Sequence, residues 1–280
     1  MEDRYQRNIL VEGIGVEGQA RLSASKVLVI GAGGLGSPAL FYLAAAGIGT
    51  IGIVDDDTVN LSNLQRQILH FTQDLGHRKT DSAKQKLSGL NPDIKVITYN
   101  CRFSKANAEN IINGSLVDGN NGTVSERSRT VPAVEFMSLP DEMSNASSKN
   151  PVVDEYDFVI DCCDNFATKL LINDICVNMK KPYSHGAIIA MRGEVMTYTP
   201  GSACYRCVFE TPPEDGILPT AAQAGVLGSV AGIVGSLQAT EAIKYLVGMT
   251  DLITNRILII DAQKTTFFSL NVHKRNSCIC

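Results

Sequence analysis

The chain has 280 residues, of which 44% are hydrophobic, and a formal net charge of −4 at pH 7. This length and composition can bury a sizeable core, and the slight acidic balance argues against nucleic acid as a partner. No apolar run reaches the length of a membrane span, and the charged segment Met1–Tyr5 lacks the apolar region of a signal peptide. We therefore expect a cytoplasmic protein that binds neither membrane nor nucleic acid.

The first part of the chain alternates apolar strands with helices. Residues 1–24 are expected to be helical, and strands are predicted at 26–31, 50–54 and 95–99. Helices are predicted at 35–46, 80–90 and 106–112, and Asn91-Pro92 ends the second of them. This alternation is typical of a parallel sheet with right-handed crossovers.

Residues 113–152 depart from this pattern. They are rich in Asn, Ser and Gly, contain several charges and prolines, and show little periodicity. A loop of this length without structure is unusual inside a compact domain. We therefore predict a mobile insertion at 113–152.

The second part of the chain adds strands without intervening helices. Strands are predicted at 158–161, 183–189, 193–198, 257–261 and 265–272, and helices at 169–179 and 225–247, with a proline-containing loop at 208–222. We expect the later strands to be antiparallel additions. The predicted fold class is α/β, a Rossmann-like mostly parallel sheet with helices on both faces, extended by antiparallel C-terminal strands, with residues 1–280 forming one domain.

A glycine-rich turn follows the first strand. Its glycines permit a tight turn and close approach of a phosphate, and the next helix offers unpaired N–H groups; they are Gly31, Gly33, Gly34 and Gly36. Such a turn alone is a weak signal, because NAD, flavin and other nucleotide proteins share it. Asp55, at the end of the second strand, is placed to accept hydrogen bonds from ribose hydroxyls, and Asp57 is the second candidate.

Polar and basic residues directly after this acid favour ATP over a dinucleotide. Hydride transfer needs no additional cation, whereas Arg66 and Lys79 suit a triphosphate. Asn63 and Gln67 accompany them in the same segment. Either cation alone would be an ordinary surface residue, so the combination carries the prediction of ATP.

A second polar segment follows the buried strand at 158–161. The carboxyl end of a parallel strand is where open α/β sheets bind ligands. A carboxylate beside a triphosphate requires a bridging cation, usually Mg²⁺. We predict Asp164 as the Mg²⁺ ligand, Asn165 as a nucleotide-binding neighbour and Asp161 as a structural residue.

Two cysteine pairs stand out among the eight cysteines. Cys204 and Cys207 form a CxxC motif, and Cys278 and Cys280 form a CxC motif. Together they offer four thiolates for a structural zinc ion. The alternative is two pairs of surface thiols, reduced or oxidised.

Several motifs together resemble those of a known family. They are Arg4–Asn8 (RYQRN), Gly31–Gly36 (GAGGLG), Asp55–Gln67 (DDDTVNLSNLQRQ), Lys79, Asp164-Asn165, Cys204–Cys207 (CYRC), Ala224–Gly228 (AGVLG) and Gly235–Lys244 (GSLQATEAIK). With them, the chain resembles the MoeB/ThiF/HesA group, bacterial relatives of ubiquitin-activating enzymes. The resemblance extends over nearly the whole chain outside 113–152.

The resemblance implies a nucleotidyltransferase. The C-terminal Gly-Gly carboxylate of a ubiquitin-like sulfur carrier protein would attack the α-phosphate of ATP, giving an acyl-adenylate and pyrophosphate for sulfur transfer in molybdopterin, thiamine or related metabolism. Asn63, Arg66 and Lys79 would neutralise the phosphates, and Asp164 would hold Mg²⁺. Arg7 would reach across a homodimer into the ATP site of the second copy.

The chain departs from the family pattern at three places. The second cysteine pair is normally CxxC, Lys169 stands where relatives often have arginine, and Ala221 occupies the position of a cysteine that links some relatives to the carrier. Alanine has no nucleophile, so either the protein stops at adenylation or a native cysteine has been replaced. Since the sequence contains no rhodanese-like extension, we expect a separate sulfur donor protein.

Other functions remain open from the sequence. The same chemistry could adenylate a small-molecule or peptide carboxylate. A tRNA-modifying dehydratase of the superfamily is disfavoured by the absence of a basic stripe, and an inactive ATP-binding scaffold by the presence of Arg66, Lys79 and Asp164.

Overall fold

The structure, a computed structural model, describes residues 2–114, 155–211 and 221–280. The insertion predicted at 113–152 therefore lies outside the described residues except at its first two positions. The same holds for most of the loop predicted at 208–222. No helix within the described ranges is long and apolar enough to cross a membrane.

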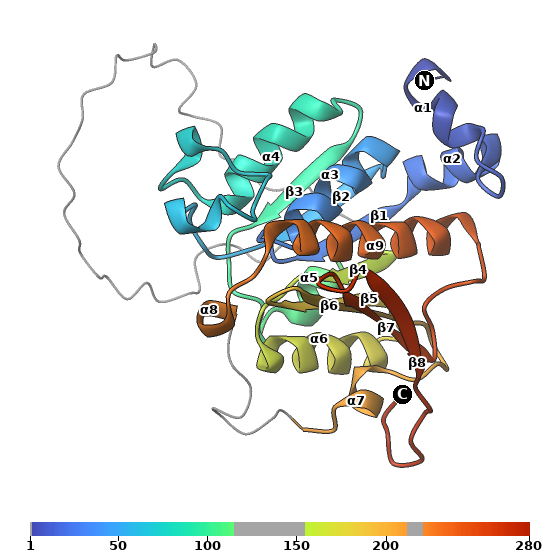
Figure 1. Cartoon of the computed structure of the whole chain (residues 1–280). Coiled ribbons are helices and arrows are strands. Elements are labelled where there is room, and N and C mark those ends of the chain that lie inside the picture. The colour runs from blue at the N-terminus through green and yellow to red at the C-terminus, as the bar shows by residue number, and fades with distance from the viewer. Residues whose placement is uncertain (1, 115–154, 212–220) are drawn as a thin grey trace, which may run out of the picture.

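One eight-stranded sheet runs through the protein, in the order β3-β2-β1-β4-β5-β6-β7-β8 (Figure 1). Its strands are β1 (Lys26–Ile30), β2 (Thr50–Val54), β3 (Lys95–Tyr99), β4 (Phe158–Asp161), β5 (Tyr183–Ile189), β6 (Arg192–Tyr198), β7 (Arg256–Asp261) and β8 (Thr266–Asn271). The pairs from β3 to β5 are parallel, and those from β5 to β8 are antiparallel. The predicted mostly parallel sheet with antiparallel C-terminal additions is confirmed.

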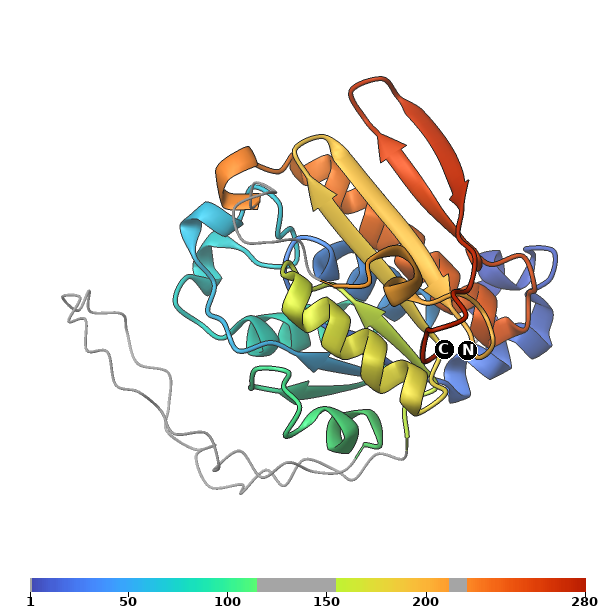
Figure 2. The same cartoon turned by 90° about the horizontal axis from the view of Figure 1, so that it is seen from below.

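Helices cover both faces of this sheet (Figure 2). They are α1 (Glu2–Ile9), α2 (Gly15–Ala24), α3 (Gly36–Ala46), α4 (Lys79–Leu90), α5 (Ala108–Ile112), α6 (Phe166–Asn178), α7 (Tyr205–Val208), α8 (Ala221–Ala224) and α9 (Gly228–Val247), with short 3-10 turns η1 (Leu61–Asn63) and η2 (Thr72–Asp74). The apolar side chains of α3, α4 and α9 share one core with β1, β2 and β4. Those of α5 and α6 form a second core on the opposite face.

Some helix boundaries differ from the sequence prediction for local reasons. The helical region predicted at 1–24 is divided, because Gly13 and Gly15 adopt positive φ angles of 86° and 62°. The helix predicted to begin at residue 169 begins earlier, at Phe166. Asn165 is its N-cap, and the side-chain Oδ1 of Asn165 accepts the N–H of Thr168 at 2.9 Å.

Helix α9 begins three residues later than predicted and packs closely on its neighbours. Gly225 has a φ of 76°, and Leu227 is extended, so the helix starts at Gly228. A Cβ at Gly228 would collide with the carbonyl oxygen of Gln65, and a Cβ at Gly235 with that of Leu35. The start of α9 therefore lies directly against the segment that follows β2.

Candidate active site

The candidate site lies where the strand order reverses. From β1 the chain proceeds to β2 and β3 on one side, and from β4 to β5 on the other, while β1 and β4 are adjacent. Ile30, the last residue of β1, is in register with Asp161, the last residue of β4. Parallel α/β sheets bind ligands outside the carboxyl ends of the strands at such a point.

The four glycines of the turn have two different structural roles. Gly31 has a φ of 103°, and a Cβ there would lie 2.8 Å from the carbonyl oxygen of Cys162. A Cβ at Gly36 would overlap the carbonyl oxygen of Gly31. At Gly33 and Gly34 the nearest protein atoms would be 3.4 and 3.5 Å away, which is ordinary contact or close to it. Packing therefore requires glycine at Gly31 and Gly36, whereas a Cβ would meet only ordinary contacts at Gly33 and Gly34, which lie on the partly exposed side of the turn.

Asp55 connects the end of β2 to this turn. Its Oδ2 accepts the N–H of Ala32 at 2.7 Å, and its Oδ1 accepts the N–H of Asp57 at 2.9 Å. Burial raises the pKa of Asp55 above its ordinary value, and the charge of Lys79 partly opposes this effect. An ionised carboxylate has about four acceptor positions, so Asp55 keeps capacity for the hydroxyls of a ribose.

His70 supports the other side of the same peptide, and sequence reasoning missed it. Its Nε2 lies 2.8 Å from the carbonyl oxygen of Ala32, and its Nδ1 lies 2.9 Å from the hydroxyl of Ser82. A carbonyl only accepts, so Nε2–H donates and Nδ1 accepts from Ser82. Burial lowers the pKa of His70 and favours this neutral form. No spacing in the sequence marks it, because Ala32 is 38 residues away along the chain.

Asn63, Arg66 and Gln67 are brought to the turn by η1. The carbonyl oxygen of Asn63 accepts the N–H groups of both Arg66 and Gln67, at 3.1 and 3.0 Å. The side-chain stem of Arg66 lies beside Gly34, and the amide of Gln67 lies beside Gly33. The Oε1 of Gln67 is buried, and none of the described residues donates to it. An orphaned acceptor at a glycine-rich turn fits a site in which a bound ligand supplies the donor.

Lys79 is a buried cation at the start of α4. Its side chain is 6% exposed, and its Nζ donates to Oδ2 of Asp57 at 2.8 Å, whereas the side chain of Asp57 is 68% exposed. An exposed carboxylate compensates a buried ammonium only in part, because water screens it. Lys79 therefore retains attraction for an additional anion at this end of the sheet.

Asp164 and Asn165 follow β4 at the same end of the sheet. Both are exposed, and the side chain of Asn165 caps α6 as described above. Asp161 is fully buried, as expected for a structural residue, and its Oδ1 accepts the N–H of Cys163 at 3.0 Å. None of the described residues pairs with the carboxylate of Asp164, and Asp161 holds the backbone of the residue before it.

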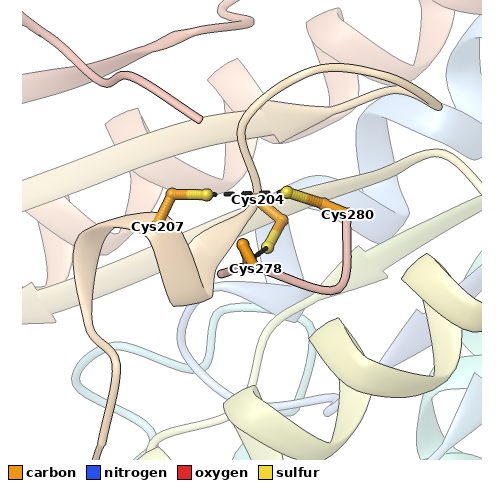
Figure 3. Close-up of side chains that lie close together, drawn as sticks. All are labelled: Cys204, Cys207, Cys278 and Cys280. Atoms are coloured by element: carbon orange, nitrogen blue, oxygen red, sulfur yellow. Dashed lines mark hydrogen bonds between the residues drawn. The ribbon is translucent and has the colours of Figure 1, made fainter. Parts of the chain in front are cut away.

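The four predicted zinc ligands come together in the structure (Figure 3). Cys204, Cys207, Cys278 and Cys280, the four-cysteine cluster, have sulfur atoms that all lie within 4.8 Å of one another. The Sγ atoms of Cys204 and Cys278 are 3.4 Å apart, and those of Cys207 and Cys280 are 3.5 Å apart. A tetrahedral zinc ion with Zn–S bonds of about 2.3 Å places sulfurs roughly 3.8 Å apart. The shortened CxC spacing therefore still permits one site with four thiolates.

The thiols of this cluster differ in how readily they ionise: burial raises the pKa of Cys204 and of Cys280, whereas the pKa of Cys278 is lowered. Burial opposes ionisation of Cys278, but the N–H of Cys280 and the neighbouring thiols outweigh it and lower the pKa of Cys278 to about 7. A thiolate is the form that binds a metal. Two separate disulfides would not require all four sulfurs to be mutually close, so the arrangement favours a metal over oxidised pairs.

Arg7 is the one residue predicted for the nucleotide site that the structure keeps apart from the others. It is exposed on α1, and α1 is fixed at the opposite end of the sheet, where the amide of Asn91 donates to the hydroxyl of Tyr5 at 2.7 Å. Asn91 follows the last residue of α4, whereas Lys79 is its first residue. Figure 1 shows α1 on the far side of the molecule from residues 61–74. Arg7 does not approach the candidate site of its own chain.

The fold and this site define a Rossmann-like α/β protein with a glycine-rich turn at its switch point, and comparison with known proteins identifies its family. A model of the ThiF family matches residues 5–118 and 124–280. The chain belongs to the ThiF family.

Two curated relatives are similar over nearly their whole length. The chain is 38% identical to the SAMP-activating enzyme E1 of Haloferax volcanii, with 99% of this chain and 87% of that protein covered. It is 36% identical to the sulfur carrier protein adenylyltransferase of Thermus thermophilus, with 99% and 89% covered. Six further relatives are longer, and the chain spans 52% to 60% of their length.

Solved structures share the fold. The crystal structure of E. coli MccB with ATP has a TM-score of 0.75 and 22% sequence identity, and the match covers 99% of this chain and 74% of that chain. At this identity the likeness establishes the architecture alone.

Proposed function

We propose that this protein is an ATP-dependent adenylyltransferase that activates the C-terminal Gly-Gly carboxylate of a ubiquitin-like sulfur carrier protein. The observation that carries the proposal is the buried Lys79, which lies with Arg66 and a partly exposed glycine turn at the switch point of a ThiF-family sheet. Relatives whose names specify this activity are 36% to 38% identical over almost the entire chain.

In this proposal the nucleotide lies across the carboxyl ends of β1 and β4. Its phosphates approach the backbone at Gly33 and Gly34, which have no side chains and are partly exposed. Asp55 accepts hydrogen bonds from the ribose, and the orphaned Oε1 of Gln67 accepts another donor of the ligand. Asn63 fixes the backbone that carries Arg66 and Gln67.

The chemistry is one displacement at phosphorus. A carboxylate oxygen of the carrier forms a bond to the α-phosphorus of ATP, and the bond between that phosphorus and the bridging oxygen of the β-phosphate breaks. Pyrophosphate leaves with the electron pair, so the charge that develops there is stabilised by Arg66 and Lys79. The attacking group is already ionised, and no general base is required.

Two metals fit the residues present. Asp164 is exposed and unpaired among the described residues, and we assign it to Mg²⁺, which would neutralise phosphate charge when bound. The four-cysteine cluster has the donor set and the spacing of a structural zinc site. We assign Asn165 to the edge of the nucleotide site, where its side chain also caps α6.

Arg7 and Ala221 extend the proposal to partners. Since Arg7 is far from the site in its own chain, we propose a homodimer in which each Arg7 contacts the phosphates bound by the other copy. Ala221, at the start of α8, has no nucleophile for the activated carrier. A separate sulfur donor protein would therefore complete the transfer, and residues 1–280 would act as one adenylation domain.

The proposal is tested by exchange of labelled pyrophosphate into ATP, measured with a panel of carriers that end in Gly-Gly. Exchange should depend on the carrier and disappear when its terminal glycine is removed. Lys79→Met should reduce exchange by roughly 10²- to 10³-fold, the usual loss for one stabilising donor. Lys84→Met, an exposed position on the same helix, is the matched control and should retain wild-type activity.

The outcomes separate the candidate functions. Exchange with one carrier identifies the substrate. Tight binding of ATP without exchange for any carrier would refute the carrier assignment and direct the search to small-molecule or peptide carboxylates. Failure to bind ATP at all would refute the nucleotide site itself.

A further inference from the structure

A cluster of four charged or titratable side chains lies beneath the loop that carries Asp164. Asp161 accepts from Nδ1 of His185 at 2.9 Å and lies 3.2 Å from Nζ of Lys169. The Nζ of Lys169 also donates to the carbonyl oxygen of Gly186 at 2.6 Å. On its other side, Nε2 of His185 lies 3.3 Å from Oε1 of Glu194. The side chains of Asp161, Lys169 and His185 are at most 5% exposed.

The cluster holds an ionised carboxylate in the interior. Burial alone would raise the pKa of Asp161, but Lys169 and His185 outweigh it, and the pKa lies below its ordinary value. Buried ion pairs contribute little net stability compared with apolar packing. Their use here is geometric, because the same carboxylate accepts the N–H of Cys163 and so fixes the loop one residue before Asp164.

The four-cysteine cluster reaches this network through Tyr205. Tyr205 lies between Cys204 and Cys207, and its ring centroid is 4.0 Å from that of His185, with an angle of 33° between the planes. The backbone N–H of Tyr205 donates to Oδ1 of Asn173 on α6 at 2.9 Å. Tyr205 is 1% exposed. Helix α7, which begins at Tyr205 and contains Cys207, is therefore held against the imidazole.

These contacts form one continuous path from sulfur to the loop after β4. We propose that Tyr205 and His185 are positioning residues through which the four-cysteine cluster fixes the orientation of Asp164. The path passes from the tyrosine ring to the imidazole, then to Asp161 and the amide of Cys163. It rests on the proposed function in one respect, since it takes Asp164 as the ligand of the metal beside the phosphates.

Tyr205 offers a substitution with a matched control. Tyr205→Leu removes the ring that covers His185. Tyr205→Phe keeps the ring and removes only a hydroxyl to which no described residue is hydrogen-bonded. The readout is binding of Mn²⁺, used in place of Mg²⁺, in the presence of a non-hydrolysable ATP analogue and followed by electron paramagnetic resonance. Bound zinc is measured in each sample.

Tyr205→Leu should retain zinc and bind Mn²⁺ about 10-fold more weakly, the lower end of the loss when a supporting residue behind a metal ligand is removed. Tyr205→Phe should match the wild type. Amide hydrogen exchange at residues 162–165 should be faster in Tyr205→Leu alone. Equal Mn²⁺ affinity and equal exchange in the two variants, with zinc retained, would overturn the inference.

A second pair of variants covers the case in which Tyr205→Leu does not fold. His185→Asn can still donate to Asp161 in place of Nδ1, whereas His185→Leu cannot. Weaker Mn²⁺ binding in His185→Leu, restored in His185→Asn, supports the step from His185 to Asp161, and equal affinities in the two variants refute the inference. Failure of the wild type to bind Mn²⁺ with the nucleotide analogue would instead refute the metal role of Asp164, and with it the proposed function.

Discussion

Substitution of Gly31 by alanine tests whether packing, rather than a ligand, requires glycine at the start of the turn. The residue has a φ of 103°, and an added Cβ would lie 2.8 Å from the carbonyl oxygen of Cys162. This is about 0.7 Å inside the ~3.5 Å at which heavy-atom contacts become favourable. Gly34 is the matched control, because its added Cβ would have ordinary contacts at 3.5 Å with Ala231 and Arg66.

Two costs determine how much stability Gly31→Ala should lose. An unfavourable positive φ costs about 1 to 3 kcal/mol, and an overpacked contact costs roughly 1 to 3 kcal/mol. The turn can relax toward solvent, so we expect Gly31→Ala to lose about 3 kcal/mol, which lowers the Tm by roughly 6 to 12 °C for a chain of this size. Gly34→Ala should remain within about 0.5 kcal/mol of the wild type.

Thermal unfolding and ATP titration of the two variants form the assay. Gly34→Ala should keep its Tm and lose ATP affinity, because the new methyl group fills the space between the turn and Arg66. Gly31→Ala should have both a lower Tm and a lower affinity for ATP. If the two variants unfold at the same temperature, the division of the four glycines into packing and ligand roles is wrong.

Three other properties can be checked in the same way. As the pH falls below about 6.5, His70 is protonated in the unfolded chain before it is protonated in the native state. The free energy of unfolding should therefore fall by up to ~1.4 kcal/mol per pH unit until the native pKa is reached. Urea unfolding at several pH values should show this fall in the wild type and not in His70→Gln. Arg7→Ala and Asp164→Ala should each abolish the exchange of pyrophosphate into ATP. If each site is shared across a two-fold dimer, an equal mixture of the two variants should recover roughly a quarter of wild-type activity. No recovery would place Arg7 outside the site. Removal of zinc by a chelator should lower the Tm of the wild type. Cys278→Ser should have this lowered Tm without chelator, and chelator should not change it further. A wild type whose Tm does not respond to chelator and whose four thiols are free would exclude the zinc site.

The strands of the sheet could be predicted from the sequence because the patterns that indicate them are local. Strand β4, for example, is an unbroken apolar run that ends in Asp161, and its predicted bounds match the observed ones. The glycine turn, Asp55 and the two cysteine pairs were found because tight turns and chelation constrain spacing within a few residues. Cys204 and Cys278 are 74 residues apart, yet the pairing of two short motifs was enough to predict their proximity.

The residues that support the site from behind could not be predicted from the sequence, because their contacts are not local. His70 contacts Ala32, and Tyr205 contacts His185, through packing of segments that are distant in sequence. Neither contact leaves a periodicity or a spacing that a single sequence displays. The predicted start of α6 was also three residues too late, because the capping role of Asn165 depends on its backbone conformation and not on its residue type alone.

The pairing of β1 with β4 has a consequence for how the protein folds. Asp157, directly before β4, accepts the N–H of Lys26 across 131 residues of sequence, and the switch point exists only once this pair has formed. Non-local pairing of this kind is slow. ATP binding by the nascent or refolding chain should therefore appear late, and its onset would time the closure of the sheet.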